Sequence, residues 1–379
     1  MEMTFLSTEM LKKAQTEIGS VEEAISVLRK YGHFRTLADK LGAFSKGRNL
    51  RAILTAGLIK NHPEINPDSV DRKVRNWLNG RQDTIGKKDV IELCFILELD
   101  VNESDELLAM ITDEGFHGRD PDEIPYIFAL TNGFSYERAR VLSERVSVAY
   151  NKKDSNISCD TDRTNIISRE ISEIYTEEKL IEYVANERGR LGRLHNTAYS
   201  FFTAMMDKLE NPVDFEKDEA FPENTTYTVG MIVRDYLHGD FVKGGEKKDV
   251  PSLHNALKRS IGRNWPDEYV LSRIKNRHQD VTRKVLILLF LATYDSGDDE
   301  LYYDEEESTP EEESREFYIQ MNNMLVSCGF NRLDPRSSFD WIIIYCIFLS
   351  DSWEIDSTLS AFLENVFSDD ESGNEVQKR

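Results

Sequence analysis

The stretch Val70–Asp100 (VDRKVRNWLNGRQDTIGKKDVIELCFILELD) carries the clearest fold signal in this chain of 379 residues. Its first part is basic and places Val74 and Leu78 four residues apart, which is the spacing of one helix face, and Gly80 follows where a helix would end. After a short polar turn, Lys88–Leu99 is a second, mostly apolar segment with helical periodicity. The stretch therefore predicts two helices joined by a turn.

A similar pattern occurs a second time, in Asp267–Asp295 (DEYVLSRIKNRHQDVTRKVLILLFLATYD), where Val270 corresponds to Val74. Downstream of the first copy, Gly115–Pro121 (GFHGRDP) recurs as Gly329–Pro335 (GFNRLDP), and an aromatic-rich apolar segment follows each. Because these landmarks occur in the same order over roughly a hundred residues, we predict two diverged copies of one helical module.

The composition favours helices throughout, because only 10 Pro and 20 Gly argue against a loop-rich β fold. We therefore predict an all-α fold made of tandem helical modules. Further helices are expected at Val21–Lys40, Leu50–Asn61, Ser104–Ile111, Pro121–Leu130, Ser135–Val148 and Thr228–Leu237, with a long one over Glu177–Leu209.

Shifts in composition predict the domain boundaries. The expected segments are an N-terminal helical domain (1–150) with its module at about 50–110, a polar linker (151–176), a helical connector (177–251), a second module (252–367) with an acidic insertion (298–316), and a disordered tail (368–379).

Charge is distributed unevenly along the chain. The whole chain carries −22, but 24–88 contains 14 Lys/Arg and 5 Asp/Glu, a local charge of +9, and 252–288 contains 8 and 3, or +5. Two positive islands in an acidic chain fit contacts with phosphate, although chance clustering on solvated helix faces gives the same pattern. The insertion Asp298–Glu316 is interpreted either as a solvated, disordered loop or as a DNA mimic that covers one island.

The strings Val74–Gly80 (VRNWLNG) and Lys88–Leu99 (KDVIELCFILEL) resemble the third and fourth helices of XRE/Cro-type helix-turn-helix DNA-binding proteins. The resemblance implies a degenerate helix-turn-helix-like core in each module, with a recognition helix that lies in the major groove of double-stranded DNA. Arg and Asn suit that role because they form paired hydrogen bonds with guanine and adenine. The residues expected at DNA are Arg72, Arg75, Asn76, Arg81, Lys87 and Lys88 in the first copy, and Arg273, Lys275 and Arg277 in the second.

The chain departs from the family pattern in two ways. Asn61–Asp68 (NHPEINPD) carries two prolines where the family's second helix is expected, whereas Thr36–Gly42 (TLADKLG), which resembles that helix, lies further upstream. The second copy lacks the glycine after Ile274. A module that has kept its packing and lost DNA contact is therefore an alternative interpretation.

No pattern indicates catalysis or a cofactor, and we predict that the protein is not an enzyme. The seven His residues lack the spacing of a metal site, and Glu187–Arg193 (ERGRLGR) lacks the P-loop signature. The four Cys form no CxxC pair, and neither a leader nor a long apolar run is present, which predicts reduced thiols and a cytoplasmic protein without membrane contact. Trp77 and Trp265 are interpreted as core residues rather than base contacts.

The leading hypothesis is a DNA-binding regulatory protein with tandem modules. The alternative is a non-catalytic helical adaptor whose modules bind a protein partner. The resemblance also allows a homodimer. Binding to duplex DNA with a steep salt dependence favours the first hypothesis, because phosphate contacts release counterions.

Overall fold

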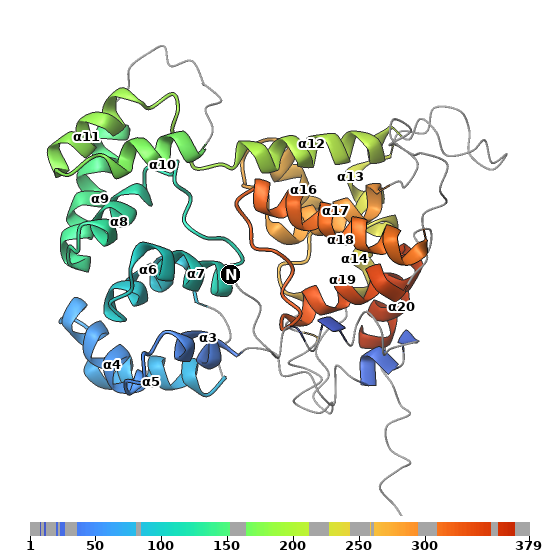
Figure 1. The fold of residues 1–379 in the computed structure, drawn as a ribbon, viewed down its shortest axis with the longest axis horizontal. Helices are drawn as coiled ribbons and strands as arrows, with labels where there is room; N and C mark the ends of the chain where they lie inside the picture. Colours follow the sequence, from blue (N-terminus) through green and yellow to red (C-terminus); the bar gives the residue numbers. More distant parts are fainter. Residues whose placement is uncertain are drawn as a thin grey trace, which may run out of the picture. The chain divides into compact units, whose positions relative to one another are not determined.

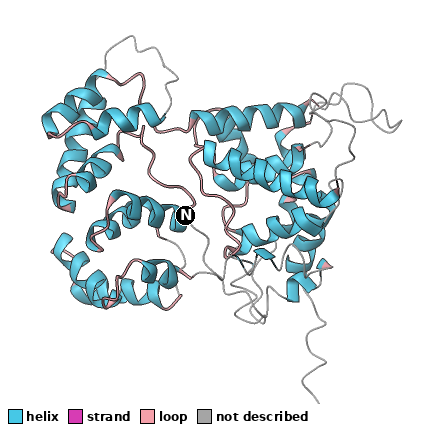
Figure 2. Cartoon of the chain, in the orientation of Figure 1, coloured by secondary structure: helices cyan, strands magenta, loops and turns pink. Residues whose placement is uncertain are grey.

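The computed structural model describes residues 8, 11–12, 20–21, 23–26, 36–80, 85–151, 164–211, 227–242, 258, 261–294, 309–349 and 355–367. Within these ranges every regular element is a helix, and the only β contact is an isolated antiparallel bridge between Glu114 and Phe330 (Figure 2). The fold is therefore all-α, as the sequence predicts. The helices, labelled in Figure 1, are α3 (Leu37–Ala43), α4 (Leu50–Asn61), α5 (Pro67–Leu78), α6 (Lys87–Ile96), α7 (Val101–Thr112), α8 (Ile124–Thr131), α9 (Tyr136–Tyr150), α10 (Thr164–Ser172), α11 (Glu177–Asn186), α12 (Asn196–Glu210), α13 (Val229–Asp235), α14 (Gly239–Val242), α16 (Glu268–Lys275), α17 (Arg283–Thr293), α18 (Pro310–Ser327), α19 (Ser338–Leu349) and α20 (Ile355–Phe367).

The chain divides into two compact units. Unit 1 contains Arg35–Asn196 and Cys328–Asn331, and unit 2 contains the rest of the described chain. This division differs from the expected N-terminal domain (1–150), because Ser20 belongs to unit 2 and its carbonyl oxygen accepts a hydrogen bond of 2.6 Å from the Tyr345 hydroxyl.

The range expected to be a polar linker (151–176) contains a packed helix. In α10, Ile167 and Ile171 are buried in a core that they share with α8, α9 and α11. The long helix expected over Glu177–Leu209 is divided into α11 and α12, and Gly189 and Gly192 lie between the two. Glycine destabilises a helix interior by roughly 1 kcal/mol relative to alanine. The expected connector (177–251) is therefore divided as well, with α11 in unit 1 and α12 in unit 2.

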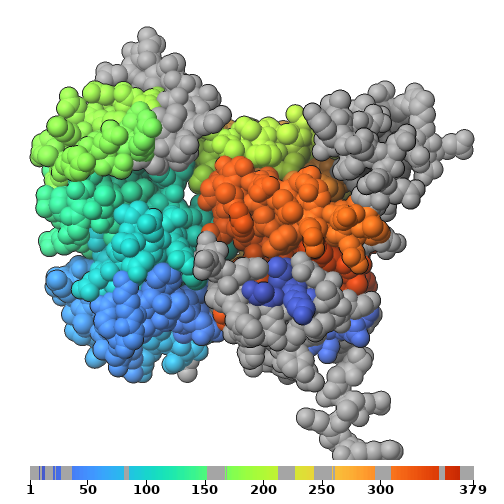
Figure 3. Space-filling model, in the orientation of Figure 1, coloured from blue at the N-terminus to red at the C-terminus, as the bar shows by residue number. Residues whose placement is uncertain are grey.

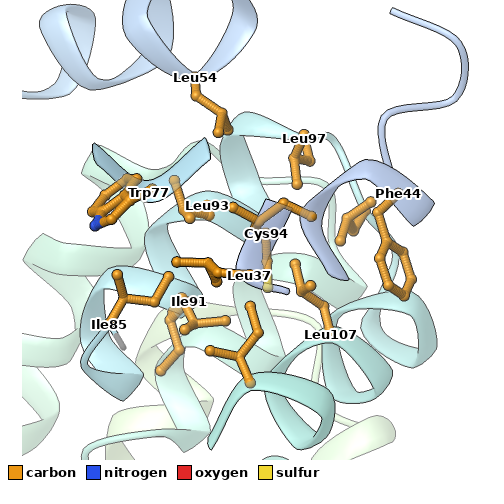
Figure 4. Packing of buried hydrophobic residues seen from close by; sticks show 14 of the residues in the cluster. Leu37, Phe44, Leu54, Trp77, Ile85, Ile91, Leu93, Cys94, Leu97 and Leu107 are labelled. Atoms are coloured by element: carbon orange, nitrogen blue, oxygen red, sulfur yellow. The ribbon is translucent and has the colours of Figure 1, made fainter. Parts of the chain in front are cut away.

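Helices α3 to α7 of unit 1 enclose an apolar core. Figure 4 shows Trp77 of α5 in this core with Leu54 of α4, Leu93 of α6, Leu97 directly after α6, and Leu107 of α7, all of them 0% exposed. Burial of each aliphatic side chain contributes roughly 1.5–3 kcal/mol. Helix α4 contacts α5 and α6, while α3 contacts α5 and α7, so the core fixes α5 from two sides.

The helices that follow in the two sequence copies make corresponding contacts within their units. In unit 1, α6 contacts α7 and α9, α7 contacts α8, and α8 contacts α9. In unit 2, α17 contacts α18 and α20, α18 contacts α19, and α19 contacts α20. The order of contacts is the one that a duplicated module predicts, and superposition of the two copies stays a prediction.

The repeated Asp-Pro dipeptide forms the same local turn in each copy. Asp120 accepts the backbone N–H of Asp122 at 2.8 Å, and Asp334 accepts that of Arg336 at 2.9 Å. In both cases the intervening residue is proline, which has no N–H of its own, so the carboxylate bonds two residues on. Each turn leads into the aromatic-rich helix of its copy, α8 or α19.

A cation and a carboxylate join two helices in each copy. In unit 1, Lys87 at the first position of α6 lies 2.7 Å from Glu123, the residue that precedes α8. Burial raises the pKa of Glu123, although Lys87 opposes the shift. In unit 2, Arg283 at the first position of α17 forms two hydrogen bonds of 2.8 Å to Asp340 of α19, and both side chains are almost fully buried. The same Asp340 accepts the backbone N–H of Asp334.

The end of the acidic insertion is helical rather than a loop. Helix α18 begins at Pro310, and Thr309 and Glu312 exchange side-chain and backbone hydrogen bonds at its start. These bonds lower the pKa of Glu312. The remainder of the insertion, 298–308, and the expected tail, 368–379, lie outside the described residues.

Candidate nucleic-acid interface

Helices α4 and α5 form a helix–turn–helix pair at the surface of unit 1 (Figure 3). Helix α5 begins at Pro67, earlier than the expected Val70, because proline is favoured at the first position of a helix and Asn66 accepts the N–H of Asp68 at 2.9 Å. Both prolines of Asn61–Asp68 are therefore accommodated, one in the turn and one at the helix start. The helix that precedes α5 along the chain is α4, which ends at Asn61.

The two faces of α5 differ sharply in exposure. Val70, Val74 and Trp77 are buried, whereas Arg72 and Arg75 are exposed. Arg72 forms no hydrogen bond or ion pair with any other described residue. The helical-wheel prediction that both arginines lie opposite the apolar stripe is therefore confirmed.

Three further residues of the candidate set have different surroundings. Lys88 is exposed and without an ion pair among the described residues, and Asn76 is half-buried. Lys87 is expected at phosphate, but its side chain is only 21% exposed and is bound to Glu123, so the structure ties it to the fold. Arg81 lies outside the described residues.

Arg51, which sequence reasoning does not single out, also shapes this surface together with Asp71. Arg51 of α4 donates from two guanidinium nitrogens to Asp71 of α5, at 2.8–3.0 Å, and Arg75 approaches the same carboxylate at 3.1 Å. Arg51 and Asp71 also line a shallow hollow between α4 and α5 whose floor includes Ala52 and Ala56. Asp71 therefore forms an ion pair with one arginine from each of the two helices.

Glu92 of α6 binds the end of α4 and the first residue of the turn that leads to α5. This carboxylate is 4% exposed and binds the Asn61 amide at 2.9 Å and the His62 ring at 3.1 Å. The signal in the sequence is a single acidic residue within the apolar string VIELCFI. Buried carboxylates require such partners, because an unpaired one loses its hydration.

In the second copy the three candidate cations are bound within unit 2. Lys275 lies 2.6 Å from Glu210. Arg273 donates to the His278 carbonyl at 3.0 Å, and Arg277 lies over the Tyr199 ring at 4.3 Å from its centroid. Each of the three therefore has a partner within unit 2, and their contact with DNA stays a prediction.

The two tryptophans beside the expected recognition elements differ in burial. Trp77 is 0% exposed, with Lys73 over its ring at 4.9 Å. Trp265 donates to the Leu237 carbonyl at 2.8 Å and meets Phe339 edge-on. The interpretation as a core residue is confirmed for Trp77, whereas Trp265 is only half-buried.

Within the described part of the chain, no three His, Cys, Asp or Glu side chains come together as metal ligands. Cys94, Cys328 and Cys346 are buried and free, and burial raises the pKa of each thiol. Cys159 lies outside the described residues. None of the described helices is long and apolar enough to cross a membrane.

No family model, curated protein or solved structure matches this chain with significant similarity.

Proposed function

We propose that this chain is a DNA-binding regulatory protein whose unit 1 reads double-stranded DNA with helix α5. The observation that carries the proposal is the exposed pair Arg72 and Arg75, on the face of α5 opposite its buried stripe. Guanidinium groups recognise guanine and phosphate through paired hydrogen bonds. The α4–turn–α5 geometry and the local charge of +9 over 24–88 support the same interpretation.

The test is a double replacement, Arg72→Ala with Arg75→Ala, assayed against duplexes selected from a random pool. Each lost bidentate base contact removes about 1–3 kcal/mol of discrimination, so the variant should lose its sequence preference. Replacement of exposed residues usually changes stability by no more than about 0.5 kcal/mol, so circular dichroism should show a folded protein.

A charge-matched control is Arg138→Ala with Arg145→Ala. Both arginines lie on α9 of the same unit, are 53% and 43% exposed, and bind Glu177 rather than α5. The control should keep the sequence preference. Equal losses in both variants, or a preference retained without Arg72 and Arg75, would exclude α5 as the reading helix.

A second candidate function is a helical adaptor that binds a protein partner. The observation that favours it is the internal engagement of Arg273, Lys275 and Arg277, which leaves the second copy without the cationic face of the first. An adaptor should bind duplex DNA weakly and without selection, whereas phosphate contacts give an affinity that falls steeply with salt. The dependence of the affinity for duplex DNA on salt concentration therefore distinguishes the two functions.

A further inference from the structure

One carboxylate on the proposed reading face binds two guanidinium groups. Asp71 Oδ1 accepts from Arg51 Nε at 3.0 Å and Nη2 at 2.8 Å, and Asp71 Oδ2 lies 2.9 Å from Arg51 Nη2 and 3.1 Å from Arg75 Nε. The Asp71 side chain is 30% exposed, while Arg51 and Arg75 are 52% and 50% exposed. The cluster is therefore open to a ligand, and it links α4 to α5.

Stability alone gives little reason for this cluster. A solvated surface ion pair contributes roughly 0–1 kcal/mol. Near phosphate, the negative charge of Asp71 is unfavourable, because it repels the ligand that the surrounding cations attract. Asp71 therefore weakens non-specific binding to phosphate. A favourable effect of this carboxylate can come from the orientation that it gives to Arg51 and Arg75.

Orientation is what the geometry supplies. A free arginine side chain has about 2 kcal/mol of rotamer entropy to lose on binding, and a fixed guanidinium loses less of it. Asp71 and Arg75 form an ion pair in which Nε is the nearest guanidinium nitrogen, at 3.1 Å, and neither terminal amino group of Arg75 is hydrogen-bonded to a described residue. Two parallel donors at a fixed angle match O6 and N7 of guanine.

We propose that Asp71 is a specificity-determining residue, which orients Arg75 toward a guanine edge and ties the guanidinium of Arg51 to the same surface. The inference rests on the proposed function of α5. It predicts that the selected duplex contains a guanine whose replacement weakens binding by the wild type and has a smaller effect on Arg75→Ala.

The experiment replaces Asp71 with Asn and measures affinity for the selected duplex and for a scrambled one at two salt concentrations. Removing a negative charge should leave scrambled binding unchanged or tighter. The ratio of selected to scrambled affinity should fall roughly 10-fold, which is within the contribution of one bidentate base contact. A simple charge effect raises both affinities and leaves their ratio unchanged.

The matched control is Asp68→Asn, one turn earlier on the same helix. Asp68 is exposed and has no guanidinium partner among the described residues. The substitution Asp68→Asn therefore removes the same charge without releasing an arginine. The control should keep the wild-type ratio. If Asp68→Asn lowers the ratio as much as Asp71→Asn does, the proposed orienting role is wrong.

A measurement without DNA tests the role of Asp71 separately from the proposed DNA-binding function of α5. The Arg75 Nε–H should exchange slowly with water in the wild type and faster in Asp71→Asn, as followed by proton–nitrogen NMR. Equal exchange rates, or an unchanged affinity ratio beside selective wild-type binding, would overturn the role of Asp71 alone. Wild-type protein that selects no duplex, with Arg75 slow to exchange, would overturn the DNA-binding function.

Discussion

Replacing Asp340 with Asn should strongly destabilise unit 2. Arg283 and Asp340 have side chains only 6% and 3% exposed, and two hydrogen bonds of 2.8 Å join them. The variant keeps an oxygen that can accept the N–H of Asp334, so what it removes is the negative charge. The guanidinium of Arg283 then stays buried without the charge of Asp340, while its hydrogen bond to the Arg332 carbonyl remains.

The size of the effect follows from this burial. Removing one partner of a buried ion pair costs about 3–5 kcal/mol, because the other charge remains without compensation. In a domain of roughly 150–250 residues each kcal/mol shifts Tm by about 2–4 °C, so the expected decrease is about 6–20 °C. The corresponding pair in unit 1 provides a control, since Lys87 is 21% exposed and retains access to water. Glu123→Gln should therefore change stability much less than Asp340→Asn does.

Native-state hydrogen exchange, read on peptides from α19 and α8, measures each unit separately. A double variant, Arg283→Met with Asp340→Leu, leaves no buried charge and should be more stable than Asp340→Asn. If Asp340→Asn loses less than about 1 kcal/mol, or if the double variant is no more stable than the single one, the buried pair does not act as described.

Three further predictions concern packing, pH and the acidic segment. Gly57→Ala places a methyl group against the Ile96 side chain of α6 and should destabilise unit 1 by about 1–3 kcal/mol in urea unfolding. The control Gly42→Ala places its methyl group where no atom lies within 4 Å, and it should stabilise unit 1 by roughly 0.5–1 kcal/mol. Burial raises the pKa of Asp120 to about 6 from 3.8. Ionisation of this group is therefore disfavoured in the folded state, and the stability of unit 1 falls as the pH rises from about 4 to about 6. Asp120→Asn should stabilise unit 1 by about 2 kcal/mol at pH 7, allowing for the partial exposure of the group, and give no gain below about pH 4. Deleting Asp298–Ser308, which leaves the start of α18 intact, should tighten DNA binding in a gel-shift titration, because acidic side chains repel phosphate within roughly 8–10 Å.

Helices with clear apolar periodicity and a polar cap could be predicted closely from the sequence. The expected bounds of Leu50–Asn61 are those of α4, whose start is capped by Asn49. The apolar periodicity places the start of α5 three residues late, because it does not register Pro67, which occupies the helical position that proline favours. The packed helix α10 was hidden in a polar segment, since its burial depends on α8 and α11.

The candidate site could be predicted only in part. A helical wheel places Arg72 and Arg75 on one face of α5, and the structure does the same. The contact between Arg51 and Asp71 joins residues twenty positions apart and depends on how α4 packs against α5, so no local pattern reveals it. Likewise, the composition of the second copy shows its cations but not that Lys275 is bound to Glu210.

The attachment of Asn61 and His62 to Glu92 has a consequence for the entropy of recognition. Fixing the backbone of one residue costs about 1–2 kcal/mol, and for the turn that leads into α5 this loss is incurred when unit 1 folds. An unattached turn would incur it on meeting a ligand and would bind correspondingly more weakly. Under the proposed function, the affinity of α5 for DNA is therefore coupled to α6, whose core residues are buried. Mutations that loosen α6 should weaken that binding without changing which sequence is preferred.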